Sequence, residues 1–353
     1  MNDIKIGNIF KPFINWANAQ GSWPDVVFST RVRFARNVYG FSFPQRSSGE
    51  KLEEVRNIVT EAVKKIKSFS TRAHLINMKN LNSAEKMFLI ERHLISHNLA
   101  NESRSGAVAI TGDEMLSIMI NEEDHLRIQG MVSGLSIDRA FENVNSLDDE
   151  LGKILDYAYN RKFGFLTACP TNVGTGFRVS CLVHLPALTK TGQIQKVLEN
   201  LSHLGITARG IYGEGTYVLG DFYQISNATC LGHSEQEFSK NLNSVINNLI
   251  KREIRAREEL SGRDLKIKTE DSIYRAWGVL KNSRMISYEE FMQNSSLVRM
   301  GLAMGHSIPV DFVTLNQLLI LMQPVHLQVL TGKKLEPFER DIERSQYIRK
   351  ILK

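Results

Sequence analysis

The sequence predicts an α+β protein in which strands and helices mix over residues 1–258 and helices alone follow over residues 259–353. Strand-like runs recur between residues 26 and 226, and two of them, 107–110 and 115–120, are joined by the hairpin-forming sequence Thr-Gly-Asp-Glu. Beyond Leu260 strand signals nearly disappear and helical spacing dominates. We therefore expect two domains, with their boundary at the end of a long helix.

Composition is that of a soluble globular protein and excludes several other classes. The hydrophobic content of 42% and the charged content of 23% are ordinary for such a protein. No apolar run approaches the ~20 residues that a membrane span needs, and the first residues lack the hydrophobic segment of a signal peptide. Three cysteines without a CxxC pair argue against a disulfide framework or a zinc site and favour the cytoplasm. The net charge of +6 comes from Lys and Arg interleaved with Asp and Glu, so we expect no direct nucleic-acid or membrane binding.

The first strand is expected over residues 26–38. Alternation along this strand places Arg31 and Arg33 on one face and Val32 and Phe34 on the other. Two guanidinium groups on one face suit a polyphosphate, although an exposed edge strand would show the same pattern. Further helices are expected over 52–69, from Ser83, and over 147–159, 193–204, 235–260, 273–280, 311–322 and 337–352, with further strands over 126–129, 179–185 and 217–226.

An acidic turn precedes the strand over 126–129. Glu122, Glu123 and Asp124 are adjacent, and three neighbouring carboxylates usually form a solvated turn. Arg127 lies on the returning strand, which favours one acid pointing into a site. His93, near an apolar helical stripe, is typical of a packed or capping histidine.

A glycine-containing loop, Cys-Pro-Thr-Asn-Val-Gly-Thr-Gly at 169–176, lies between two apolar runs and leads to Arg178. Gly174 and Gly176 permit backbone conformations that other residues rarely adopt, so the loop can turn several N–H groups toward an anion. A tight turn with an incidental cysteine is the simpler interpretation. A second glycine-broken loop, 207–216, carries Arg209 and Glu214.

Arginines on strands or loops form the main constellation, because the sequence contains no GxxxxGK[ST], HRD or DFG motif. Each of them alone is typical of a surface, but together they would hold nucleotide phosphates and a migrating phosphoryl group with little help from the protein in binding Mg²⁺. No metal ligand is expected. The arginines are Arg31, Arg33, Arg127, Arg178 and Arg209.

These motifs resemble the ordered set of the bacterial protein-arginine kinases, the McsB branch of the phosphagen (guanidino) kinase family. The set comprises STRVR at 29–33, His93, NEEDHLR at 121–127, CPTNVGTG at 169–176, RVSCL at 178–182 and RGIYGE at 209–214. The resemblance implies a guanidino-kinase or glutamine-synthetase-like antiparallel sheet flanked by helices over 1–258. It also implies an all-α domain over 259–353 for regulation, substrate binding or dimerisation.

The resemblance implies a nucleotide site and a catalytic set. Catalysis is expected from Glu123, Glu214, Cys169, Arg127, Arg178 and Arg209. ATP contact is expected from Ser29, Thr30, Arg31, Val32, Arg33, His93, Arg127, Arg178, Val179, Ser180, Cys181, Leu182, Arg209, Gly210, Ile211, Tyr212, Gly213 and Glu214. The implied cofactor is ATP with Mg²⁺ held mainly by the nucleotide.

The acceptor explains why carboxylates are expected. A guanidinium has a pKa above ~12 and no free lone pair, so a carboxylate must orient it and take a proton. Glu123 and Glu214 are the candidates. Cys169, among arginines, is expected to have a lowered pKa and to present a thiolate, whereas Cys181 and Cys230 are expected to pack inertly.

Residues 340–345, Arg-Asp-Ile-Glu-Arg-Ser, resemble the RDxxRA motif by which this branch binds phosphoarginine away from the active site. Arg340, Asp341 and Arg344 are expected to share one helix face, and Ser345 replaces the final alanine. A solvated charged face is the commoner case.

The resemblance further implies protein substrates with exposed arginines, including stress-response repressors or misfolded proteins bound for Clp-type proteases, a zinc-binding activator protein and a homodimer. Only 28 residues precede Ser29, too few for the helical N-terminal domain of kinases that act on free creatine or arginine. Two alternatives stay open: a small-molecule guanidino kinase, and a catalytically weak phosphoarginine-binding adaptor.

Overall fold

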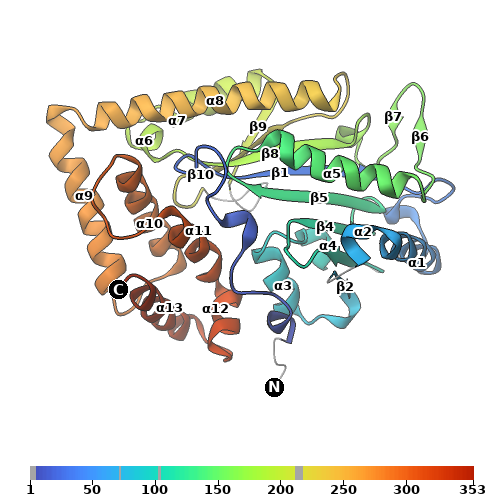
Figure 1. Ribbon diagram of the computed structural model, residues 1–353, viewed down its shortest axis with the longest axis horizontal. Helices are drawn as coiled ribbons and strands as arrows, with labels where there is room; N and C mark the ends of the chain where they lie inside the picture. Colours follow the sequence, from blue (N-terminus) through green and yellow to red (C-terminus); the bar gives the residue numbers. More distant parts are fainter. Residues whose placement is uncertain (1–4, 71–72, 102–104, 211–217) are drawn as a thin grey trace.

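A computed structural model of the chain describes residues 5–70, 73–101, 105–210 and 218–353. Within them, a central antiparallel sheet of eight strands runs in the order β2-β3-β4-β5-β1-β8-β10-β9 (Figure 1). Its strands are β1 (Val27–Arg36), β2 (His74–Asn77), β3 (Ala107–Ile110), β4 (Leu116–Ile120), β5 (Leu126–Ser133), β8 (Phe177–His184), β9 (Ile206–Arg209) and β10 (Phe222–Asn227). The predicted α+β class and antiparallel sheet are confirmed.

Two long helices cover one face of this sheet. α5 (Ile137–Gly152) packs on β1 and β5, and α8 (Glu235–Leu260) packs on β8 and β10. Val32 and Phe34 of β1 are buried, and the Phe34 ring packs against Phe141 of α5 with centroids 6.4 Å apart. The alternation read from the sequence therefore assigns the apolar face correctly, and Arg31 and Arg33 project to the opposite face.

The other helices flank the sheet or form the C-terminal part of the chain. Around the sheet lie α1 (Gly49–Lys65), α2 (Lys67–Ser70), α3 (Ser83–Glu91), α4 (His97–Asn101), α6 (Pro186–Lys190) and α7 (Ile194–His203). The C-terminal helices are α9 (Arg263–Asn282), α10 (Tyr288–Ala303), α11 (Phe312–Leu321), α12 (Pro324–Thr331) and α13 (Pro337–Ile351). In Figure 1 these five, orange to dark red, gather on one side of the molecule.

Three predicted helices are wrong in extent. The helix expected over 273–280 is part of the longer α9, which begins at Arg263. The helix expected over 147–159 is α5, which begins at Ile137, because further apolar residues at helical spacing precede Leu147 and pack on the sheet. Tyr159 instead belongs to a small hairpin of β6 (Tyr159–Asn160) and β7 (Gly164–Phe165). The helix expected over 52–69 is interrupted at Ile66, whose backbone is extended (ψ 125°).

Other elements follow the sequence more closely. α8 begins and ends at the predicted residues, behind a Ser234–Glu237 capping box. β10 is shorter than the strand expected over 217–226 and begins at Phe222, while Tyr217 lies outside the described residues.

The C-terminal helices share one hydrophobic core with the sheet. Phe291 and Met292 of α10 belong to the same buried cluster as Phe28 of β1 and Phe222 of β10. Within the described part of the chain no single helix is long and apolar enough to cross a membrane, and α11 and α12 together reach that length only across a 92° bend.

Candidate functional site

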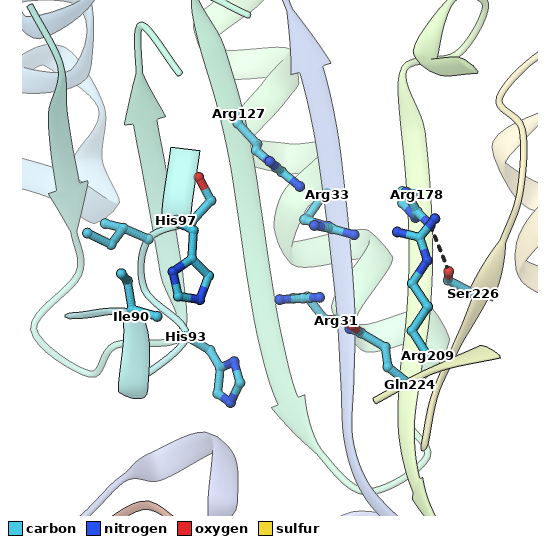
Figure 2. A pocket seen from close by; sticks show the side chains of 12 residues that line it. Arg31, Arg33, Ile90, His93, His97, Arg127, Arg178, Arg209, Gln224 and Ser226 are labelled. Atoms are coloured by element: carbon cyan, nitrogen blue, oxygen red, sulfur yellow. Dashed lines mark hydrogen bonds between the residues drawn. The ribbon is translucent and has the colours of Figure 1, made fainter. Parts of the chain in front are cut away.

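Strand register gathers arginines on the face of the sheet opposite α5 and α8. Arg33 of β1 lies directly across from Arg178 of β8, and Ala35 lies across from Arg127 of β5. Arg209 of β9 pairs with Gln224 of β10. Because paired residues project to the same face of a sheet, these side chains and Arg31 point into one space. Figure 2 shows them converging from neighbouring strands.

The arginines form one side of a pocket, and the end of α3 with the segment that leads into α4 forms the other side. Arg178 Nη2 donates to Ser226 Oγ at 3.1 Å, so β10 helps to orient it. The pocket is lined by Arg31, Arg33, Arg127, Arg178, Arg209, Gln224 and Ser226 from the sheet and by Ile90, His93, Ile95, Ser96 and His97 from the opposite wall. Gln224 and Ser226 were not singled out from the sequence, although strand alternation places both on the face of Arg178.

Positive charge is crowded in this pocket. Burial, together with the neighbouring Arg127 and Arg178 guanidinium groups, lowers the pKa of Arg31 to about 9. Burial and the charges of Arg31 and Arg127 lower the pKa of Arg33 well below its ordinary value, against a smaller opposing effect of Glu122. Burial and mutual repulsion thus disfavour the charged forms of Arg31 and Arg33, and a bound polyanion would offset the repulsion between these guanidinium groups.

Glu122 is the counter-charge of Arg127. Both its carboxylate oxygens accept hydrogen bonds from Arg127 Nη1, at 2.7 and 2.9 Å, and its Oε1 also accepts from Ser96 Oγ at 2.5 Å. Burial alone would lower the pKa of Arg127, but Glu122 and the nearby acids Glu123 and Asp124 raise it on balance. The sequence does not distinguish Glu122 from its neighbours, because three adjacent acids give no indication of which one turns inward.

The other two acids of the turn behave differently. Glu123 is half-buried, its carbonyl accepts from Gln45 Nε2 at 2.8 Å, and it does not line the arginine pocket. Asp124 is buried, and its Oδ1 accepts from Asn37 Nδ2 at 2.6 Å and from the Ala168 N–H at 2.7 Å. Burial raises the pKa of Asp124 to about 6. Asp124 therefore ties the acidic turn to the residue preceding Cys169.

The loop at 169–176 is held at its C-terminal end through the backbone of Gly174 and Thr175. Cys169 is half-exposed, with its Sγ 3.0 Å from Thr171 Oγ1, and it does not line the arginine pocket. The Thr175 carbonyl accepts from buried Arg36 Nη1 at 2.8 Å. Gly174 has φ +112°, and an added Cβ there would meet the Cys230 carbonyl at 2.4 Å, so glycine is required.

His93 closes the wall of the pocket in a left-handed backbone conformation, φ +58°. Its carbonyl accepts from Gln129 Nε2 at 2.7 Å, and its ring meets Trp16 edge-on with centroids 5.6 Å apart. Burial and the charge of Arg31 lower the pKa of His93 to about 3, so the ring is neutral near pH 7.

The remaining predicted contact residues alternate between the two faces. Ser180 and Leu182 lie on the pocket side of β8 with Arg178, and Ser29 lies on that side of β1. Val32, Val179 and Cys181 are buried in the core, and burial raises the pKa of Cys181 to about 12. The buried Thr30 hydroxyl donates to the Gly134 carbonyl at 2.6 Å, and Gly210 follows β9. Ile211, Tyr212, Gly213 and Glu214 lie outside the described residues.

The stretch over 340–345 lies far from this pocket in sequence, on α13. Arg344 is buried, donating from Nε to the Met322 carbonyl at 2.9 Å and from Nη1 to the Ile286 carbonyl at 2.8 Å. Asp341 accepts from Arg344 Nη1 at 2.5 Å. Ser345 is buried and donates to the Arg284 carbonyl at 2.6 Å, while Arg340 is partly exposed.

No group of three or more His, Cys, Asp or Glu side chains suited to a metal ion occurs in the described ranges. Among those residues, the pocket offers guanidinium donors rather than metal ligands. This donor set fits a nucleotide whose phosphates carry their own cation.

Comparison with known proteins places these features in a family. Residues 54–256 match the family model described as ATP:guanido phosphotransferase, C-terminal catalytic domain, and residues 266–353 match the Protein-arginine kinase McsB C-terminal domain. The chain is 43% identical to the protein-arginine kinase of Halothermothrix orenii, over 97% of both chains. It is also 43% identical to that of Symbiobacterium thermophilum, over 95% of both chains.

Solved structures show the same fold. Lombricine kinase superposes with a TM-score of 0.61 at 25% identity, covering 72% of this chain and 75% of that one. The duplicated taurocyamine kinase from Schistosoma mansoni, with bound transition state analog components, superposes with a TM-score of 0.60 at 26% identity over 67% of this chain and 34% of that one.

Proposed function

This chain belongs to the ATP:guanido phosphotransferase family, within its protein-arginine kinases, and from this premise we propose that it phosphorylates arginine side chains of proteins with ATP. The observation that carries the proposal is the set of arginines from β1, β5, β8 and β9 on one sheet face. Phosphoryl transfer depends on positioning and on stabilising charge, which such a set provides.

In the proposed reaction a guanidine nitrogen of the acceptor attacks the γ-phosphorus of ATP. The N–P bond forms, the bond to the β,γ-bridging oxygen breaks, ADP leaves, and the nitrogen's proton passes to a carboxylate. Arg31 and Arg33 would bind the phosphates, and Arg127, held by Glu122, would stabilise the transferring group. Mg²⁺ bound by the nucleotide would neutralise phosphate charge.

Glu123 and Glu214 are the proposed carboxylates for the acceptor, and Cys169 is the proposed loop thiolate. Support for Glu123 is its place beside Glu122, directly before the buried Asp124 that anchors the loop of Cys169. Glu214 rests on the motif 209–214 alone. Because Glu123 lies outside the arginine pocket, the proposal places the acceptor's guanidinium beside that pocket rather than within it.

The proposal is tested by incubating the purified chain with ATP and either an unfolded protein or free arginine. Phosphorus NMR at neutral pH, which spares the acid-labile P–N bond, should show phosphoarginine in the protein and none with the free amino acid. Turnover on free arginine alone would favour the second candidate, a small-molecule guanidino kinase, which the likeness to lombricine and taurocyamine kinases supports.

We also propose the partners that family membership suggests. These are stress-response repressors or misfolded proteins destined for Clp-type proteolysis, a zinc-binding activator protein and a second copy of the chain. The proposed location is the cytoplasm. Phosphoarginine is the proposed ligand of Arg340 and Asp341 on α13. The side chains of Arg340 and Asp341 are partly exposed, which favours a surface site, and buried Arg344 anchors α13 to the Met322 carbonyl.

A further inference from the structure

Glu91 connects the C-terminal helices to the wall of the arginine pocket. It is the last residue of α3 and is buried. Its Oε1 accepts from the Val325 N–H at 3.0 Å, and its Oε2 accepts from the His326 N–H at 2.9 Å and from His326 Nδ1 at 2.7 Å. The Glu91 carboxylate thus accepts hydrogen bonds from two N–H groups in the first turn of α12, which have no partner within the helix, and from the His326 ring.

The contact is reinforced on both sides of the carboxylate. Gln323 Nε2 donates to the Glu91 carbonyl at 3.1 Å. The His326 ring stacks on Phe88 of α3, with centroids 4.3 Å apart at 21°. In addition, Arg344 of α13 donates from Nε to the Met322 carbonyl at 2.9 Å, one residue before Gln323. The turn that starts α12 is therefore fixed against both α3 and α13.

The chain that leaves Glu91 becomes the pocket wall at once. His93, two residues later, has φ +58°, a conformation that is uncommon for residues other than glycine and persists only when its surroundings hold it. Gln129 holds its carbonyl, and Ser96 then contacts Glu122, the partner of Arg127. The Glu91 contacts anchor the start of this segment, and the Glu122 contact anchors its end.

We propose that Glu91 is a positioning residue for the nucleotide: by fixing α3 to the start of α12, it holds His93 and Ser96 against the arginine-lined face, so that the C-terminal helices set nucleotide affinity. The inference rests on the proposed function, since it takes the pocket as the ATP site. Part of that site's geometry then depends on the contact between Glu91 and His326, which are 235 residues apart along the chain.

Glu91→Gln in the full-length chain tests this, because glutamine keeps the size but loses one acceptor oxygen. Calorimetric titration with MgATP and separate measurement of KM and kcat should show the ATP Kd and KM raised about tenfold, with the KM for the protein acceptor unchanged. His326→Phe keeps the stacking on Phe88 and removes one donor, so it should raise the ATP Kd less. It carries the test if Glu91→Gln does not fold.

Ser296→Ala is the matched control. Ser296 of α10 donates to Asp221 Oδ2 at 2.6 Å and contacts His184 Nε2 at 2.8 Å, so it is another buried contact between the C-terminal helices and the sheet. It should lower the melting temperature and leave the ATP Kd unchanged. An unchanged ATP Kd in Glu91→Gln, or an equal loss in Ser296→Ala, overturns the inference alone. Failure of the wild type to bind ATP overturns the proposed function and this inference with it.

Discussion

At the scale of residues, counter-charge is distributed unequally over the arginine pocket. Arg127 has a two-oxygen contact with Glu122, whereas neither Arg31 nor Arg33 forms an ion pair with any described residue. A guanidinium fixed by a carboxylate is oriented before a ligand arrives, and one without a carboxylate is available to a phosphate. This difference predicts separate roles in transition-state stabilisation and nucleotide binding.

Arg127→Lys should lower kcat by about 10²- to 10³-fold, the usual cost of losing one oriented donor to a developing charge. Lysine keeps the charge but cannot reproduce the planar fork that Glu122 orients. Turnover and ATP Kd would be measured separately, with Arg139→Lys on the exposed surface of α5 as the control. Retained kcat with weakened ATP binding would place Arg127 on the bound nucleotide instead.

Glu123→Gln and Glu122→Gln should have different effects, although the residues are adjacent. Glu123→Gln should fold normally, bind ATP normally and lose about 10²- to 10⁴-fold in turnover, because the acceptor nitrogen keeps its proton. Glu122→Gln should also lose turnover, as Arg127→Lys does, and should in addition lower the free energy of unfolding, because it removes the buried partner that orients Arg127. Urea denaturation measured beside turnover separates the two variants. Near-normal turnover of Glu123→Gln would remove that residue from the mechanism.

At the scale of elements, the 340–345 motif on α13 contains both buried and partly exposed residues. Arg344 and Ser345 face inward and bond carbonyls of neighbouring segments, whereas Arg340 and Asp341 stay partly exposed. The sequence predicts that Arg340 and Arg344 share one helix face, but Arg344 is not exposed there, because it is buried and already bonded to two carbonyls and to Asp341. A ligand would meet Arg340 and Asp341 first.

Asp341→Ala should leave basal phosphorylation of a short arginine peptide nearly unchanged and abolish any activation by added phosphoarginine. The carboxylate is the group suited to hold the ligand's guanidinium. Initial rates would be followed during a phosphoarginine titration, with Glu343→Ala on the same helix as the control. An equal response of wild type and Asp341→Ala would reduce this stretch to a charged face that supports the fold.

At the scale of the whole molecule, buried polar contacts join the C-terminal helices to the sheet. Arg299 of α10 bonds Asn316 of α11 and the Pro24 carbonyl and lies 5.9 Å from the centre of the Phe222 ring. His184 of β8 contacts Ser296 of α10. Such groups are costly to separate because each would be left buried without a partner, so the two predicted domains should unfold together.

Acid should destabilise the molecule through buried histidines. His125 accepts from the Val38 N–H on Nδ1 and donates from Nε2 to the Ser42 carbonyl, and burial lowers its pKa from 6.5 to about 4. Between these values the unfolded chain binds a proton that the native chain does not. The free energy of unfolding therefore falls as the pH decreases from 6.5 to 4, by about 3 kcal/mol for this group.

His125→Gln should lower stability at pH 7 and give a shallower fall from pH 6.5 to 4 in urea denaturation. Asp124 and Glu253, whose pKa values burial raises to about 6 and about 7, act in the opposite sense. The difference between variant and wild type isolates the share of His125. An identical slope in both proteins would contradict the assignment.

The sequence alone determined features that depend on local periodicity and on short motifs. Alternation in β1 separates Arg31 and Arg33 from Val32 and Phe34, because successive strand residues point to opposite faces wherever the strand lies. The bounds of α8 follow from its apolar spacing. The motifs also identified the family and the arginines of the pocket, because matching a motif requires only the residue types and their spacing along the chain.

Tertiary structure decided which neighbours each polar group meets. It selected Glu122 rather than Glu123 as the partner of Arg127, turned Arg344 inward, and placed Glu91 against His326. No local pattern encodes these choices, because each depends on the register of β4 with β5 or on the docking of helices from opposite ends of the chain. A buried charge is stable only where the assembled fold brings a complementary group to it, and that group is set by packing over long distances in sequence.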